Sequence, residues 1–175
     1  MSQQTTRPQS PVAGMVGAMA VLVVLVLGYA GVQSLRTRTE ARVSTVDYAR
    51  VVPDARRAAD FDLLAPAHLP AGWRATTVSF SGAPDSHWHL GVLTAQDRYV
   101  GLEQGRGSVA SMVTTYVDEA ATRGRPVLVA GRSWTSYTDP KGDLALAHRV
   151  GRTTTLVVGH EVPRPDLIGY AASLR

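Results

Sequence analysis

The feature that most constrains this chain is an apolar run of 21 residues near its N-terminus, residues 12–32. The run contains no charged residue and no proline. At a rise of about 1.5 Å per residue, a helix of this length spans roughly 30 Å, the hydrocarbon thickness of a bilayer. A cleaved signal peptide is the alternative, but its apolar core usually has about 7–15 residues. We therefore predict an uncleaved transmembrane helix over residues 12–32.

This segment divides the chain into regions with different compositions. We expect residues 1–11 to be a disordered tail and residues 33–60 to be an Arg-rich stalk or linker. Residues 61–175 are long enough for one folded domain. There are no cysteines, so disulfides and thiolate chemistry are excluded.

The net charge of +4 lies beside the apolar segment and not on the predicted domain. Residues 33–57 contain six arginines and three acidic residues, whereas residues 58–175 contain eleven basic and eleven acidic residues. A DNA-binding face requires basic residues concentrated on the domain itself, while arginines beside a membrane segment suit anionic lipid headgroups. We therefore predict the lipid bilayer as a partner and no binding of nucleic acid.

The remainder of the chain shows mainly strand patterns. Short runs rich in Val, Thr and aromatic residues alternate with Gly, Pro and Asp clusters. They predict seven strands, at residues 73–80, 88–94, 99–104, 126–130, 133–138, 144–150 and 153–160. An apolar stripe over residues 109–120, with Ser108 as N-cap, and the pattern over residues 165–174 predict two helices. Because βαβ alternation is lacking, we expect an α+β domain: an antiparallel sheet of about six or seven strands with two helices packed on one face.

The two last strands are expected to form a tight hairpin. Gly151 suits the first central position of a type II′ turn. A two-residue turn there pairs His148 with residue 155, and His160 with residue 143. The two histidines therefore lie far apart along the hairpin and do not converge on one metal ion.

A second pair of histidines, His87 and His89, could share one face of a strand and bind a metal ion. Trp88 between them points to the opposite face, which is the expected core face. A zinc site needs further ligands, and the sequence places none beside this pair. We predict no metal site and no cofactor.

Catalytic motifs are also missing from the sequence. The glycine-rich stretch at residues 101–109 lacks both the Walker ending and the G-x-G-x-x-G spacing. Residues 131–135 depart from G-x-S-x-G, and residues 160–164 depart from the zincin pattern. A hydrolase would need a Ser or His converging with a carboxylate, which the sequence does not indicate. We predict no catalytic residues and no enzymatic activity.

Three aromatic residues, Trp73, Trp134 and Tyr137, are the candidates for partner binding. They would serve this role if they lined an exposed groove. Core packing is the alternative for each of them.

Several short motifs occur in an order that is similar to a known family. They include Leu-Pro-Ala-Gly-Trp-Arg at residues 69–74, Trp-His-Leu-Gly at 88–91, Leu-Glu-Gln at 102–104 and Ala-Ala-Ser-Leu at 171–174. The chain resembles a family of actinobacterial single-pass membrane proteins catalogued as a domain of unknown function, number 4245 of its series. The resemblance implies an anchored domain outside the cytoplasm and supplies no catalytic residues. The arginine count after the apolar segment points the other way, because taken alone it favours a cytoplasmic domain.

Together these patterns predict a membrane-anchored, non-catalytic envelope protein at the plasma membrane. Its extracytoplasmic domain, residues 61–175, would bind a protein, a lipid or a cell-wall partner. The alternative is an accessory subunit of a membrane complex that acts through the transmembrane helix and the stalk.

Overall fold

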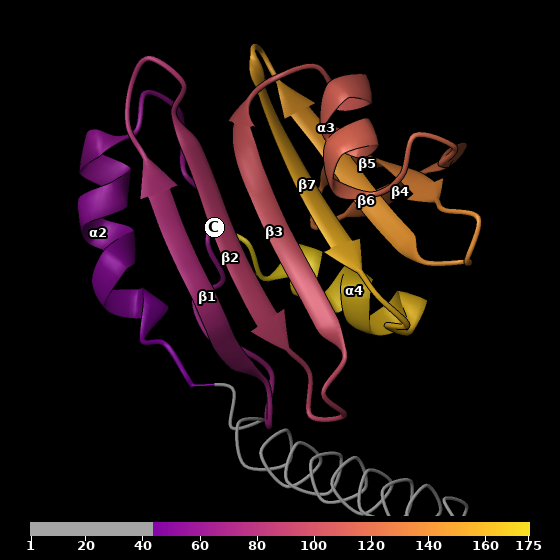
Figure 1. Cartoon of the computed structure of the whole chain (residues 1–175), viewed down its shortest axis with the longest axis horizontal. Helices are drawn as coiled ribbons and strands as arrows, with labels where there is room; N and C mark the ends of the chain where they lie inside the picture. The colour runs from indigo at the N-terminus through magenta and orange to yellow at the C-terminus, as the bar shows by residue number, and fades with distance from the viewer. Residues whose placement is uncertain (1–43) are drawn as a thin grey trace, which may run out of the picture. The chain divides into compact units, whose positions relative to one another are not determined.

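The computed structural model describes residues 44–175, which form a single seven-stranded antiparallel sheet with three helices (Figure 1). The strands lie in the order β1-β2-β3-β7-β6-β5-β4. Their bounds are Arg74–Ser81 for β1, His87–Leu93 for β2, Tyr99–Arg106 for β3, Thr122–Val129 for β4, Arg132–Thr138 for β5, Leu144–Val150 for β6 and Thr153–Gly159 for β7. The helices are α2 at Tyr48–Ala58, α3 at Val109–Tyr116 and α4 at Arg164–Ala172.

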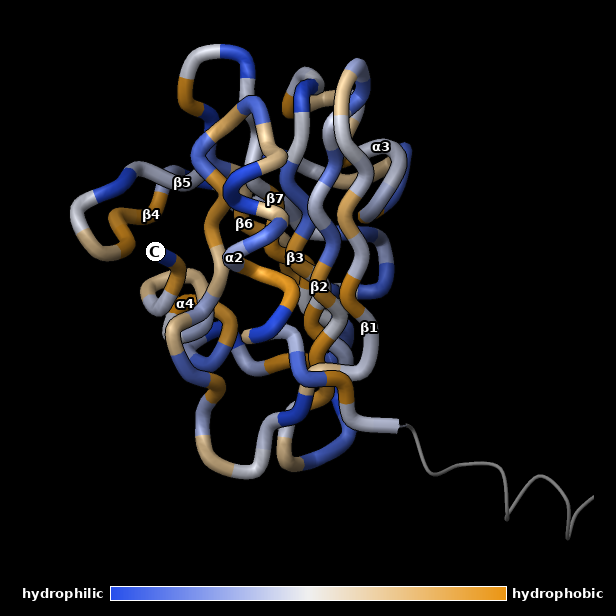
Figure 2. Tube along the Cα trace, turned by 90° about the vertical axis from the view of Figure 1, so that its left-hand side faces the viewer, coloured by the Kyte–Doolittle hydropathy of each residue, from blue (hydrophilic) through white to orange (hydrophobic). Residues whose placement is uncertain are grey.

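The helices cover both faces of the sheet, so the domain has three layers. α2 and α4 share the larger apolar core with one face, and the side chains of Trp88, Leu90 and Val92 are fully buried there. α3 packs on the other face, over Ala147 and Leu156 of β6 and β7. Figure 2 shows the hydrophobic residues gathered where α2 and α4 meet the sheet. The core face predicted for Trp88 is confirmed.

The predicted fold class requires two corrections. The expected placement of the helices on one face is wrong, because β6 and β7 bear apolar side chains on both faces and each face needs a cover. The expected transmembrane helix is not found either: within residues 44–175 no helix is long and apolar enough to cross a membrane. The segment predicted to do so, residues 12–32, lies outside the described residues, as does the predicted tail at residues 1–11.

Helix α2 lies in the region that was expected to be a stalk. Its residues Val52 and Ala55 are buried in the larger core, and its Arg56 donates a hydrogen bond from Nε to the carbonyl oxygen of Leu63 at 3.2 Å. The folded domain therefore begins well before residue 61.

Residues 61–66, here called the wall segment, run beside the sheet without belonging to a named strand. The backbones of Ala65 and Arg175 exchange two hydrogen bonds, each of 3.1 Å, and Pro66 forms an isolated bridge with Leu174. The C-terminal residues therefore fix the wall segment from one side, while the sheet fixes it from the other.

The predicted hairpin between β6 and β7 is confirmed. His148 pairs with Thr155, and Gly151 has the positive φ of 57° that its turn requires. His160 Nδ1 lies 2.9 Å from Asp143 Oδ2, as the expected register implies.

Candidate functional site

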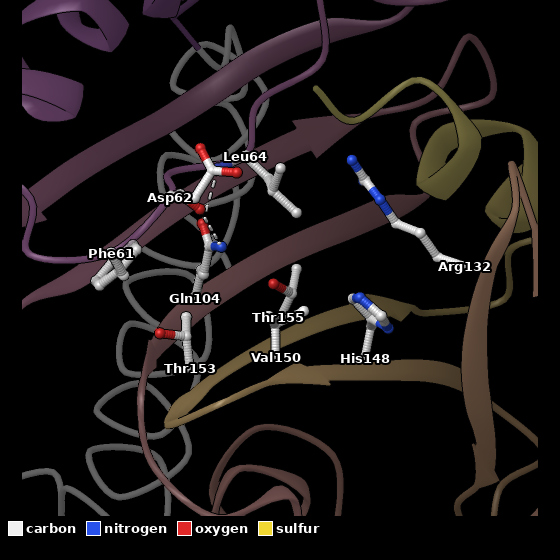
Figure 3. Close-up of a pocket in the computed structure, with 9 residues that line it drawn as sticks. All are labelled: Phe61, Asp62, Leu64, Gln104, Arg132, His148, Val150, Thr153 and Thr155. Carbon is white, nitrogen blue, oxygen red and sulfur yellow. Dashed lines mark hydrogen bonds between the residues drawn. The ribbon is translucent and has the colours of Figure 1, made fainter.

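A cleft opens between the wall segment and the sheet, on the face that α2 and α4 cover (Figure 3). Its volume is about 260 Å³. The residues that line it come from the wall segment and from β3, β5, β6 and β7: Phe61, Asp62, Leu64, Gln104, Arg132, His148, Val150, Thr153 and Thr155. Apolar and polar side chains therefore meet in one concave place, which is the common character of ligand sites.

The floor of the cleft is a row of side chains on three neighbouring strands. The register places Thr155 of β7 directly between Gln104 of β3 and His148 of β6. Neighbouring side chains in such a row stand about 5 Å apart on one face of the sheet. The row brings an amide, a hydroxyl and an imidazole together although they are far apart in the sequence.

Gln104 holds the wall segment against the sheet. Its Oε1 accepts a hydrogen bond of 2.8 Å from the backbone N–H of Leu64, and its Nε2 donates one of 2.9 Å to the carbonyl oxygen of Asp62. Gln104 is almost fully buried, so these two bonds satisfy groups that water does not reach. The shape of the cleft therefore depends on this side chain.

The opposite side of the cleft has a cation and an oriented imidazole. Arg132 of β5 is half-buried, and its Nη1 donates a hydrogen bond of 3.2 Å to the carbonyl oxygen of Leu174. The Nδ1 of His148 donates to the carbonyl oxygen of Ser133 at 2.9 Å, and the imidazole ring lies against Trp134 with ring centroids 5.3 Å apart. The bond at Nδ1 leaves Nε2 as the ring nitrogen that can contact a ligand.

A second polar cluster lies on the other face of the sheet, beside α3. Glu103 of β3 is buried between the two histidines of β2: His89 Nδ1 donates to its Oε1 at 2.6 Å, and His87 Nε2 lies 3.1 Å from its Oε2. The hydroxyl of Tyr116 on α3 lies 3.1 Å from His87 Nε2, and the two rings stack. We call these four residues the Glu103 cluster.

The electrostatics of the Glu103 cluster favour the charged carboxylate. Burial alone would raise the pKa of Glu103, but the hydrogen bonds and charges of His87 and His89 outweigh burial and hold this pKa below its ordinary value. The two histidines that suggested a metal site thus both contact the carboxylate of Glu103. In the part of the chain that the structure describes, no group of three or more side chains is arranged to hold a metal ion.

The three aromatic residues proposed for partner binding do not come together. Trp134 is fully buried in the larger core, Trp73 stacks on the buried ring of Tyr170, and Tyr137 lies on the opposite face near α3. The cleft is instead lined by residues for which the sequence predicts no binding role, with Arg132 and His148 among them.

The fold and the cleft define the class of protein: a three-layer α+β domain with an open antiparallel sheet and a small mixed-polarity cleft on one face. Residues 7–174 match the family described as "Protein of unknown function (DUF4245)", and the chain belongs to this family. No curated protein and no solved structure matches the chain.

Proposed function

We propose that residues 44–175 form a non-catalytic binding domain and that the cleft beside the wall segment is its ligand site. The observation that carries this proposal is the meeting of apolar side chains with Arg132, His148 and Thr155 in a single concavity. Ligand sites combine an apolar lining with a few polar groups that fix orientation.

The polar groups of the cleft are held in place by contacts outside it. Gln104 is fixed by two hydrogen bonds to the wall segment, and His148 by its bond to Ser133 and its contact with Trp134. Preorganised groups lose less conformational entropy when a ligand binds, so this arrangement favours binding.

The test uses the two large apolar side chains that are exposed in the described residues, Val150 and Leu128. Val150 lines the cleft and is 66% exposed, whereas Leu128 is 75% exposed on β4 and does not line it. Val150→Trp should fill the cleft, and Leu128→Trp adds the same bulk elsewhere.

Saturation-transfer NMR of the full chain with a library of small aromatic and aliphatic fragments gives the readout. We expect the fragments that bind the unmodified chain to lose their signals with Val150→Trp and to keep them with Leu128→Trp. Equal signals from both variants would show that the fragments bind outside the cleft and would contradict the proposal.

The location of the protein stays a separate proposal. We propose that the chain acts at the plasma membrane with this domain outside the cytoplasm; the apolar sequence of residues 12–32 and the implied single-pass, actinobacterial nature of the family support it. Fusions of alkaline phosphatase and of a cytoplasmic reporter to the C-terminus test it. An inactive phosphatase together with an active cytoplasmic reporter would refute the outward placement.

The alternative role as a subunit of a membrane complex depends on residues 1–57. Most of them lie outside the described residues, so this role stays a prediction. Residues 1–57 expressed alone should retain the partner if the alternative is right.

A further inference from the structure

We infer that the cleft binds a small amphipathic monocarboxylate, with the carboxylate at Arg132 and the apolar body toward Phe61 and Val150. The inference rests on the proposed function, because it names the chemical class of ligand for the same site.

The position of Arg132 determines where the carboxylate of the ligand would lie. Arg132 is the permanently charged cation among the residues that line the cleft. A guanidinium has five N–H donors in a planar fork, and one of them is used on the carbonyl oxygen of Leu174. That bond fixes the side chain while the remaining donors stay able to bind a carboxylate, which this fork geometry suits.

The hydroxyl groups on the floor add donors. Thr155 is buried at the bottom of the cleft, next to His148 in the register, and Thr153 lines the cleft further along β7. The hydroxyl of Thr155 can donate one hydrogen bond to a carboxylate oxygen that Arg132 does not satisfy, whereas Thr153 lies toward the end of the cleft where Phe61 is (Figure 3). The same two side chains present methyl groups, so they also accommodate the apolar part of a ligand.

The apolar body of the ligand would lie against the apolar side chains of the cleft. Phe61 and Leu64 belong to the wall segment, and Val150 contributes a large exposed apolar side chain. Figure 3 shows Phe61 and Arg132 at opposite ends of the cleft. A ligand that covered both ends would remove Val150 from water and neutralise Arg132 at once, so a molecule with one apolar end and one anionic end fits best.

Asp62 limits the ligand to one negative charge. Its side chain is exposed, and Figure 3 places it at the same end of the cleft as Phe61, away from Arg132. A second carboxylate at the apolar end would meet this like charge, which disfavours a dicarboxylate.

Three related compounds test the inference by isothermal titration calorimetry on the full chain at neutral pH. They are 3-phenylpropionate, its neutral amide 3-phenylpropionamide, and 3-(4-carboxyphenyl)propionate, which bears a second carboxylate at the apolar end. We expect 3-phenylpropionate to bind at least about tenfold more tightly than either of the others, as one charge-assisted contact of roughly 1.4 kcal/mol or more implies.

Variants of Arg132 and Thr155 test whether the preference for the acid over the amide arises in the cleft. Arg132→Gln should remove the difference between the acid and the amide, whereas Arg123→Gln, on an exposed arginine of β4 outside the cleft, should keep it. Thr155→Val keeps the shape of the floor and should weaken binding of the acid several-fold. This second variant keeps the test valid if Arg132→Gln unfolds the chain through the loss of its bond to Leu174.

The outcomes separate the inference from the proposed function. If the amide binds the unmodified chain as tightly as the acid, the carboxylate class is overturned while the cleft stands as a binding site. If the acid binds more tightly but Arg132→Gln and Thr155→Val leave that difference intact, the anion lies elsewhere and the inference is overturned. The comparison of Val150→Trp with Leu128→Trp reports on the cleft itself, whatever the charge of the ligand.

Discussion

His89 Nδ1 lies 2.6 Å from Glu103 Oε1, and this bond joins the second and third strands of the sheet through their side chains. Glu103 is buried, and Tyr116 of α3 reaches the same group through His87. The Glu103 cluster therefore ties a helix to the sheet on the face opposite the cleft. Its role in stability is separable from binding in the cleft.

Glu103→Gln should destabilise the domain by about 1–3 kcal/mol, because a buried hydrogen-bonded charge is replaced by an amide with different donor and acceptor sites. The free energy of unfolding in urea at pH 7 measures this. Glu119→Gln, an exposed residue near the end of α3, is the matched control and should change the free energy of unfolding little. Equal effects of both variants would show that the two contacts of Glu103 contribute nothing.

The free energy of unfolding should also fall as the pH is lowered, because Glu103 becomes protonated. Because its pKa in the folded state lies below the ordinary value of 4.5, the unfolded chain binds more protons than the folded one in that range. The stabilisation that Glu103 contributes is therefore fully present when the pH is above the ordinary pKa of the group. It is lost as the pH falls through the pKa that Glu103 has in the folded state. Asp143 acts in the same direction: burial raises its pKa, but the N–H of Glu161 and the contact with His160 outweigh burial and lower it.

The free energy of unfolding measured from pH 7 to pH 3 tests the share of Glu103. The decline below about pH 4.5 should be shallower in Glu103→Gln than in the unmodified domain. Identical slopes would mean that Glu103 has the same pKa in the folded and unfolded chains.

Gln104→Leu should destabilise the domain by about 1–3 kcal/mol, since the N–H of Leu64 and the carbonyl oxygen of Asp62 lose their partner. The loss should also raise amide hydrogen exchange in the wall segment, which hydrogen-exchange mass spectrometry reads directly. Gln96→Leu, in the exposed turn before β3, is the control. Unchanged exchange at residues 61–66 would contradict the role given to Gln104.

Gly159→Ala should cost about 1–3 kcal/mol through overpacking. A Cβ there would lie 2.9 Å from Leu167 Cδ1 on α4 and 2.9 Å from Val162 Cβ, and the latter atom cannot move away easily. A Cβ at Gly82 meets no atom within 4 Å, so Gly82→Ala should be nearly neutral. Thermal unfolding compares the two variants, and a neutral Gly159→Ala would show that both Val162 and Leu167 move aside freely, which would contradict the overpacking.

The strands could be predicted because each has its own local pattern. All seven expected strands are present, and β6 has the predicted bounds of residues 144–150. The helix after β3 was expected to reach residue 120 but ends at Tyr116. Asp118 accepts a hydrogen bond of 2.7 Å from the N–H of Ala120, and this turn competes with a further turn of helix.

Glu103 could have been found from the sequence, whereas the cleft could not. The short turn between β2 and β3 places Leu93 opposite Tyr99, and the same register places His89 opposite Glu103. The cleft depends on β7 returning to lie beside β3 after β4, β5 and β6. Such a long-range pairing leaves no local pattern, so the meeting of Thr155 with Gln104 was not visible in the sequence.

The most direct test of the central claim is the ¹H–¹⁵N NMR spectrum of the labelled full chain during titration with 3-phenylpropionate. Binding in the cleft predicts the largest shifts at the backbone amides of Thr153 and Thr155 and at the side-chain amide of Gln104, with little change at His89 and Glu103 on the other face. The largest shifts at the Glu103 cluster, with the cleft residues unchanged, would contradict the claim that the cleft is the ligand site.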